Sequence, residues 1–287
     1  MRSHEHRIRT GGVELHALLE GEGTPVVILH GFTGSCASVE GIARGLRDRH
    51  RTLRIDFIGH GASDAPAERG PYDFDRCVGQ IAEVASQLVH GPSHLIGYSM
   101  GGRDALGLCV ARPELVKSAT TIGARAGFEN AAERAQRVRD DEALADSIER
   151  DGVPAFVARW MALPLFASQR RLGAERLAQA RQQRLANRAH GLANSLRAMG
   201  AGAQPPLHAQ LAEVGAPVRL VVGEEDERFG GIADALAGEL PHARVETIPG
   251  AGHAAHLENP EAFLKVVRAF LDDVDAHRTH AADPPAA

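Results

Sequence analysis

The heptapeptide GYSMGGR at residues 97–103 places a polar hydroxyl, that of Ser99, in the middle of otherwise buried-type sequence. Glycines two positions before and after a serine are typical of a nucleophile on a sharp turn from a strand to a helix, because only small residues fit there. Such a hydroxyl becomes reactive when a histidine takes its proton and an acid orients that histidine. A serine of this kind therefore requires a base and an acid further along the chain.

The predicted acid is Asp226 and the predicted base is His253. Asp226 lies in GEEDERF just after the strand-like run 218–222, and His253 lies in GAGHAAH just after the run 243–248. The chain order Ser, Asp, His is the one expected when the serine lies on a strand-to-helix turn of a parallel sheet. Other candidates are less well placed, because they precede the serine or lie off the expected turns: Asp56, Glu224, Glu225, His30, His60 and His256.

A serine nucleophile of this kind works with two backbone N–H groups that hold negative charge on the substrate's oxygen. The segment HGFTG at residues 30–34 follows an apolar run, and it predicts that the backbone N–H of Phe32 supplies one donor. Met100, directly after the serine, supplies the other. Removing one such donor typically costs a transition state about 3 to 4 kcal/mol.

Strand and helix signals alternate along the chain on both sides of a helical interruption. Apolar runs predict strands at 26–29, 53–56, 94–97, 118–122, 218–222 and 243–248, with helices between them at 38–48, 74–89, 232–240 and 260–271. This alternation predicts an α/β fold, a mostly parallel sheet with helices on both faces. We predict a core of residues 1–124 and 206–272, an inserted helical cap of 125–205, and a disordered tail of 273–287.

Composition excludes several classes of protein. A formal charge of −5 gives no reason to expect a nucleic-acid partner, and no apolar run is long enough to predict a membrane span. The polar N-terminus shows no signal peptide, so we expect a cytoplasmic location. Three scattered cysteines, Cys36, Cys77 and Cys109, favour buried free thiols over a disulfide framework or a metal site.

Charge is unevenly distributed along the chain. Residues 125–205 contain thirteen arginines, no lysine and nine acidic residues, although the whole chain is acidic. Guanidinium groups bind carboxylates through paired planar hydrogen bonds that lysine cannot reproduce. The predicted cap therefore either is a solvated charged surface or faces an anionic substrate.

Several strings of the sequence are found in fewer kinds of protein than the serine motif is. Over nearly its whole length the chain resembles the 2-succinyl-6-hydroxy-2,4-cyclohexadiene-1-carboxylate synthases, a menaquinone-pathway family of the α/β-hydrolase superfamily. LHGFTGS, DFIGHGAS and the glycine–serine turn are shared widely among α/β-hydrolases. The more specific strings are the arginine after the turn (GYSMGGRDAL), PLFASQ at 164–169, HGLANSLRAMGAGAQPPL at 190–207 and GEEDERF at 223–229.

The resemblance implies a lyase that uses neither metal nor cofactor. Such an enzyme eliminates pyruvate from 2-succinyl-5-enolpyruvyl-6-hydroxy-3-cyclohexene-1-carboxylate, with the activated serine removing the ring proton beside the succinyl ketone. The substrate is a small polycarboxylate, which gives the arginine-rich cap a purpose. The sequence does not indicate an oligomeric state, nor whether the serine acts as a base or as a covalent nucleophile.

The resemblance also implies substrate-binding residues. The arginines that match the family's carboxylate-binding positions are Arg103, Arg137 and Arg184, and the matching aromatic residues are Tyr98 and Trp160. Arg181 and Arg188 remain rivals for the position of Arg184. The chain departs from the family pattern at His208, often an aromatic, and at Arg228, often a lysine.

Two other functions fit the same residues less fully. A serine esterase or carbon–carbon hydrolase would use Ser99 as a nucleophile and would not need arginines around its pocket. A non-enzymatic ligand receptor on this fold would not need an intact triad.

Overall fold

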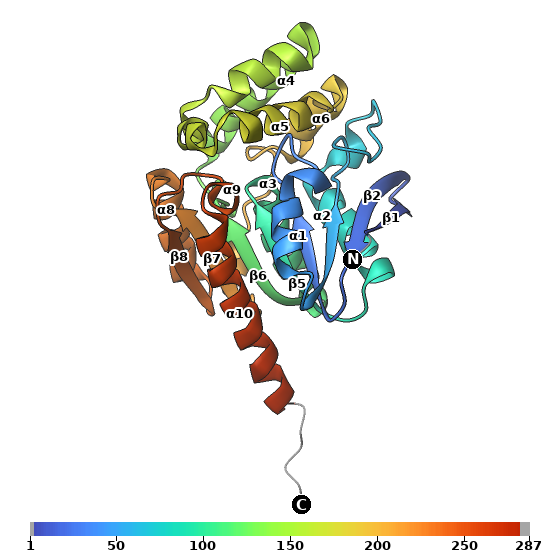
Figure 1. The fold of residues 1–287 in the computed structure, drawn as a ribbon. Coiled ribbons are helices and arrows are strands. Elements are labelled where there is room, and N and C mark those ends of the chain that lie inside the picture. The colour runs from blue at the N-terminus through green and yellow to red at the C-terminus, as the bar shows by residue number, and fades with distance from the viewer. Residues whose placement is uncertain (1–2, 282–287) are drawn as a thin grey trace, which may run out of the picture.

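The computed structural model describes residues 3–281. Its centre is an eight-stranded sheet in the order β1-β2-β4-β3-β5-β6-β7-β8. The six strands β4, β3, β5, β6, β7 and β8 run parallel to one another, whereas β2 is antiparallel to both β1 and β4. Figure 1 shows the sheet with helices on both faces, so the predicted α/β fold is confirmed.

The six predicted strands are all present, with slightly different ends. They are β3 (Thr24–Leu29), β4 (His50–Ile55), β5 (Ser93–Tyr98), β6 (Val116–Ile122), β7 (Val218–Gly223) and β8 (Ala243–Ile248). The sequence reading missed β1 (His4–Thr10) and β2 (Val13–Glu20). These two strands form an antiparallel hairpin at the edge of the sheet, and β1 alternates exposed and half-buried residues, so it lacks an apolar run.

Two apolar cores hold helices against the sheet. On one face pack α2 (Phe74–Leu88), α3 (Met100–Ala111) and α8 (Glu227–Glu239), and on the other pack α1 (Glu40–Leu46), α9 (Ala255–Glu258) and α10 (Pro260–Ala281). The short elements η1 (Cys36–Val39), η2 (Gly70–Tyr72), η3 (Pro113–Leu115) and α7 (His208–Leu211) connect the larger ones. Burial on both faces explains why the central strands read as continuous apolar runs.

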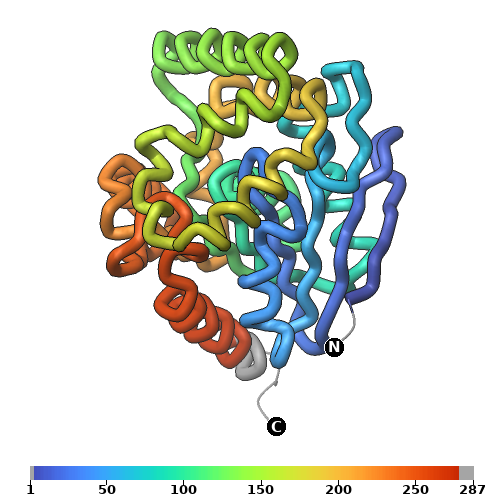
Figure 2. The backbone as a smooth tube through the Cα atoms, turned by 45° about the horizontal axis from the view of Figure 1, so that its top comes forward, coloured from blue at the N-terminus to red at the C-terminus, as the bar shows by residue number. Residues whose placement is uncertain are grey.

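A separate helical layer covers the carboxyl edge of the sheet (Figures 1 and 2). It consists of α4 (Ala131–Met161), η4 (Pro164–Leu172), α5 (Ala174–Leu185) and α6 (Ala189–Met199). α4 and α6 bury a third apolar cluster between them, and α4 is interrupted at Gly152, whose φ of 81° is not helical. The layer falls within the segment predicted to be a cap, and its exact boundaries stay a prediction.

The predicted disordered tail needs a correction. α10 continues to Ala281, with Val274 buried against the core and Asp275 paired with Lys117 and His94. The prediction is therefore wrong for residues 273–281, because Val274 and these ion pairs hold this part of the helix against the core. Its remainder, 282–287, lies outside the described residues. Among residues 3–281, no helix is long and apolar enough to cross a membrane.

Candidate active site

Ser99 occupies a strained turn between β5 and α3. Its φ of 50° and ψ of −104° lie in a region that side chains other than glycine rarely adopt. A Cβ at Gly97 would overlap the carbonyl oxygen of Gly101, and a Cβ at Gly101 would overlap that of Leu29. The two glycines therefore allow the turn, and the turn leaves the serine partly exposed above the sheet.

The structure brings Ser99, His253 and Asp226 together from three separate loops. His253 Nε2 lies 3.2 Å from Ser99 Oγ, and His253 Nδ1 lies 2.7 Å from Asp226 Oδ2. Because a carboxylate can only accept, Nδ1 carries the proton and Nε2 is left free to accept one from the serine. This geometry can deprotonate the hydroxyl at a site where His253 is buried and Ser99 is accessible.

The rival acids and histidines are engaged elsewhere. Glu224 accepts the backbone N–H of Gly250, and Glu225 pairs with Arg171. His30 Nε2 accepts the backbone N–H of Phe57, and its Nδ1 donates to the carbonyl of Gly31. None of these groups forms a hydrogen bond with Ser99 or His253 within residues 3–281.

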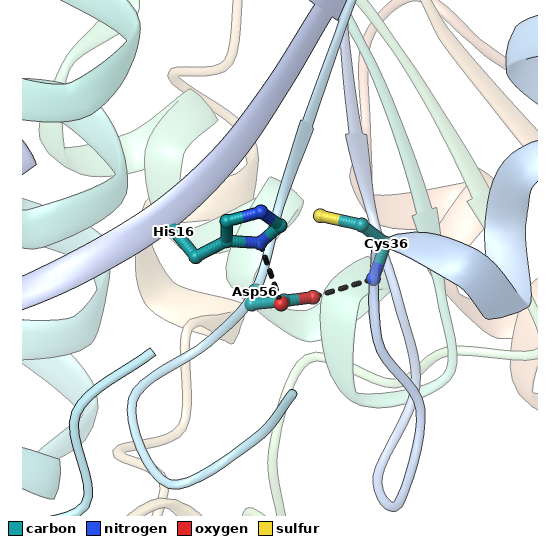
Figure 3. A group of neighbouring side chains, drawn as sticks. All are labelled: His16, Cys36 and Asp56. Carbon is teal, nitrogen blue, oxygen red and sulfur yellow. Dashed lines mark hydrogen bonds and ion pairs between the residues drawn. The ribbon is translucent and has the colours of Figure 1, made fainter. Parts of the chain in front are cut away.

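Asp56 organises the loop that follows β3 instead of joining the triad. Its carboxylate accepts hydrogen bonds from His16 Nδ1 and from the backbone N–H of Cys36 (Figure 3). The backbone N–H of Ala62 donates a third. Burial alone would raise the pKa of Asp56, but these hydrogen bonds outweigh it and the pKa is lowered. His16, Cys36 and Asp56 lie close enough to hold a metal ion, but donors already occupy both carboxylate oxygens, so we assign the cluster a structural role.

Two backbone donors near the serine are unused, one in the loop after β3 and one directly after Ser99. Within residues 3–281, the N–H groups of Phe32 and Met100 have no hydrogen-bond acceptor. The loop is held in place because Gly101 N–H donates to the carbonyl of His30 at 3.1 Å and Gly34 N–H donates to that of Gly31 at 2.9 Å. Two unused donors on the turns that flank Ser99 fit the predicted oxyanion hole.

Aromatic side chains connect this loop to the helical layer. The ring of Phe32 packs edge-on against Trp160, with centroids 5.4 Å apart, and also against Phe156 of the same helix. Trp160 contacts Phe166, whose ring lies 6.3 Å from that of His253. The predicted Trp160 thus belongs to an apolar wall between the cap and the triad.

A group of arginines lies beyond the other side of the serine turn. Arg103 is buried in the first turn of α3 and donates to Gln204 Oε1 at 3.0 Å, and Arg137 pairs with Asp141 at 2.9 Å. Arg125, which the sequence reading did not single out, stacks over Phe128 at 3.5 Å. Burial, and after it the charges of Arg228, Arg137 and Arg103, lower the pKa of Arg125 to about 10. This mutual repulsion would be relieved by a bound anion.

Arg184 lies apart from this group. It lines a cavity next to Tyr98, and its Nε is buried. Its rivals do not share that position: Arg181 is exposed, and Arg188 donates to the carbonyl of Ser63. Arg184 is therefore the only one of the three that lines this cavity.

Acid should destabilise the fold through its buried histidines. Burial lowers the pKa of His60 and His256 to about 3 and that of His94 to about 4, well below the ordinary value of about 6.5. Below pH 6.5 the unfolded chain binds protons that the folded chain does not, so stability is complete above that pH and is lost as pH falls toward 3 or 4. At pH 5 we expect each of these histidines to lower the free energy of unfolding by about 2 kcal/mol.

Urea unfolding at pH 7 and pH 5 measures this loss. In His256→Phe the free energy of unfolding should differ by about 2 kcal/mol less between pH 7 and pH 5 than in wild type. The reason is that residue 256 no longer titrates in the unfolded chain. His90→Phe, at an exposed position, is the matched control and should leave the difference unchanged. An identical pH dependence in all three proteins would contradict the assignment.

A serine on a strand-to-helix turn, a histidine and an acid from later loops, and a mostly parallel sheet beneath them define an enzyme of the α/β-hydrolase class. A family profile described as alpha/beta hydrolase fold matches residues 24–260.

Comparison with known proteins indicates which family of this class the chain belongs to. The chain is 43% identical, over 87% of its length and 90% of the relative's, to a putative 2-succinyl-6-hydroxy-2,4-cyclohexadiene-1-carboxylate synthase of Bacillus subtilis. It is 32% identical to the enzyme of that name from Escherichia coli, covering 86% of this chain and 93% of the relative. The solved structure of MenH from S. aureus has 30% identity and a TM-score of 0.86, covering 90% of this chain and 98% of that one. The chain belongs to the 2-succinyl-6-hydroxy-2,4-cyclohexadiene-1-carboxylate synthase family.

Proposed function

We propose that this enzyme eliminates pyruvate from 2-succinyl-5-enolpyruvyl-6-hydroxy-3-cyclohexene-1-carboxylate and so forms 2-succinyl-6-hydroxy-2,4-cyclohexadiene-1-carboxylate for menaquinone synthesis. The observation that carries the proposal is the buried guanidinium of Arg103, four residues after the serine, together with the repulsion among Arg103, Arg125 and Arg137 around it. Guanidinium groups gathered in this way are stabilised when an anion binds among them. A substrate with three carboxylates supplies such anions, whereas a simple ester does not.

The first step removes the ring proton beside the succinyl ketone. His253 Nε2 takes the proton of Ser99, and Asp226 holds the resulting imidazolium through Nδ1. The serine oxygen then takes the ring proton, and the electron pair of the broken C–H bond moves onto the ketone oxygen. Phe32 and Met100 N–H groups would stabilise that enolate oxygen as they would the oxyanion of a hydrolase.

The second step expels the leaving group. The enolate returns to the ketone, and its electron pair forms a new ring double bond from the carbon that carries the succinyl group. The existing ring double bond shifts by one position, and the bond from the ring to the enolpyruvyl oxygen breaks with its electron pair left on that oxygen. The imidazolium of His253 can return a proton to the departing oxygen, after which enolpyruvate converts to pyruvate. The reaction needs no water, no oxidant and no covalent enzyme intermediate. The serine therefore acts only as a base.

Arginines would orient the substrate for this chemistry. We assign Arg103 and Arg137 to carboxylates on one side of the serine turn and Arg184, near Tyr98, to a carboxylate on the other side. Guanidinium groups suit this task because they bind carboxylates in a fixed plane. The cytoplasmic location of the reaction, and the lack of a nucleic-acid partner, stay predictions.

A serine hydrolase is the second candidate, because the distances among Ser99, His253 and Asp226 suit nucleophilic attack equally well. One assay separates the two. The purified enzyme receives the enolpyruvyl substrate, with pyruvate followed through lactate dehydrogenase, and in parallel a p-nitrophenyl ester. We expect rapid pyruvate release and poor ester cleavage, and the reverse result would replace the lyase with a hydrolase.

A further inference from the structure

Two buried histidines lie at the amino edge of the sheet, at the end opposite Ser99. His50 begins β4 and His94 is the second residue of β5, and they are 3% and 0% exposed. Their rings pack edge-on, with centroids 6.1 Å apart. Asp275, near the end of α10, lies beside both of them, and Figure 1 shows α10 leading away from the helical layer. The group therefore joins two strands and a helix at a distance from the triad.

The distances among these three side chains suit a four-coordinate metal ion. His94 Nε2 lies 3.0 Å from Asp275 Oδ1, and His50 Nε2 lies 4.0 Å from Asp275 Oδ2. One ligand atom from each of the three residues lies within 4.8 Å of the other two. Ligand atoms about 2.0–2.1 Å from a tetrahedral zinc ion are about 3.3 Å apart. The two shortest distances bracket that value, so small side-chain rotations bring the ligands into place.

His50 has no hydrogen bond that would hold its nitrogens away from a metal ion. Its Nε2 faces Asp275 Oδ2 but lies too far from it for a hydrogen bond. Its Nδ1 is buried and has no hydrogen-bond partner within residues 3–281. A buried imidazole without partners is unfavourable, and a metal ion between Nε2 and the carboxylate would supply the missing interaction.

His94 is oriented by a second hydrogen bond. Its Nδ1 lies 2.7 Å from Ser118 Oγ, while its Nε2 donates to the carboxylate of Asp275. The serine hydroxyl can accept as well as donate, so His94 can also carry its proton on Nδ1 and present a lone pair at Nε2. Metal-binding histidines are commonly oriented by such a hydrogen bond at the other nitrogen. Burial also lowers the pKa of His50 and His94, so both rings are neutral near pH 7, as metal ligation requires.

Lys117 is the competitor for the carboxylate. Its ammonium contacts Asp275 Oδ1, so a metal ion must displace it. The lysine side chain is flexible and partly exposed, and it can turn toward water. The carboxylate of Asp56 differs, because two of its donors are the backbone N–H groups of Cys36 and Ala62, which cannot leave. Asp275 is itself partly exposed, which gives a metal ion and a water molecule access from solvent.

We propose that His50, His94 and Asp275 form a structural binding site for a divalent transition-metal ion of the zinc type, with water as the fourth ligand. Two imidazoles and one carboxylate suit zinc, whereas magnesium and calcium take oxygen ligands. The bound ion fastens α10 to β4 and β5. No step of the proposed elimination at Ser99 passes through it, so pyruvate release should not require it.

Cobalt(II) is the probe for this site, because it takes the same ligands as zinc and its visible absorption reports tetrahedral coordination. Titration of the full-length protein after treatment with EDTA should give a saturable visible band that zinc abolishes. His50→Gln and Asp275→Asn should each weaken cobalt affinity by at least about 100-fold, since losing even a hydrogen bond to a ligand costs about 10–100-fold. His90→Gln and Asp273→Asn, at exposed positions, are the matched controls and should bind cobalt as wild type does.

Two further variants test the surroundings of the ion. Ser118→Ala should weaken cobalt affinity about 10-fold, because the hydroxyl that orients His94 is lost. Lys117→Met should instead strengthen it about 10-fold, because the competing positive charge is removed. Zinc at about 100 times its Kd should raise the Tm of wild type by about 5 °C and leave that of His50→Gln unchanged.

Equal cobalt affinity in wild type, His50→Gln and Asp275→Asn would overturn the site, because it would mean that only surface histidines bind the metal. Absence of a zinc-dependent rise in the Tm of wild type would overturn it as well. If His50→Gln does not fold, Asp275→Asn and Lys117→Met decide the question, since they alter affinity in opposite directions and both lie at partly exposed positions.

Discussion

Ser99→Ala is expected to lower kcat for pyruvate release by about 10³- to 10⁴-fold, the range that a positioned proton acceptor contributes. Alanine removes the only hydroxyl within hydrogen-bond distance of His253 Nε2 in residues 3–281. The turn itself should survive, because Gly97 and Gly101 remain and alanine has the same Cβ as serine. The measurement is the coupled pyruvate assay with saturating enolpyruvyl substrate.

Ser86→Ala is the control for this substitution. Ser86 lies on α2, where its hydroxyl donates only to the carbonyl of Ala82, so its loss should leave kcat unchanged. Thermal unfolding of both variants shows whether they are folded. Retention of more than a tenth of the wild-type kcat in Ser99→Ala would mean that another group removes the ring proton.

Arg103→Lys is expected to lower kcat/KM for the enolpyruvyl substrate by about 10- to 100-fold, because a bidentate hydrogen bond to a carboxylate is lost while the positive charge is kept. The charge must be kept because Arg103 lies beside Asp104, a buried residue whose carboxylate oxygens have no hydrogen-bond partner within residues 3–281. Burial raises the pKa of Asp104 to about 7 even though the charge of Arg103 opposes the rise. Arg103→Ala should lower kcat/KM more, but part of that decrease would come from leaving the carboxylate of Asp104 buried without the charge of Arg103.

Ester cleavage provides the internal comparison for Arg103. A neutral p-nitrophenyl ester has no carboxylate to bind, so its hydrolysis should be nearly the same in wild type and in Arg103→Lys. Arg139→Lys, at an exposed position of α4, should change neither reaction. Equal losses for both substrates in Arg103→Lys would make Arg103 a structural residue.

The serine site was predictable because its parts follow strict local rules. A strand-to-helix turn around Ser99 needs glycines at 97 and 101, and loops after later strands must supply the acid and the base. The predicted proximity of Asp226 and His253 to Ser99 is confirmed by their distances. Their catalytic roles stay predictions until activity is measured.

Other features depend on packing that the sequence does not show. The β1–β2 hairpin was missed because an edge strand with one solvated face carries no apolar run. The tail prediction was wrong because charged residues hide the apolar side of α10, of which Val274 is a part. The stacking of Arg125 and the group of His50, His94 and Asp275 become visible only when distant parts of the chain are brought together.

The central claim is that Ser99 acts as a base toward carbon and not as a nucleophile toward a carbonyl. A single-turnover experiment with substrate carrying deuterium at the ring position beside the succinyl ketone tests it most directly, with pyruvate followed in time and the quenched enzyme weighed by mass spectrometry. The account predicts slower pyruvate release from the deuterated substrate and an unmodified enzyme. Equal rates for the two substrates, together with a covalent adduct on the peptide that contains Ser99, would contradict it.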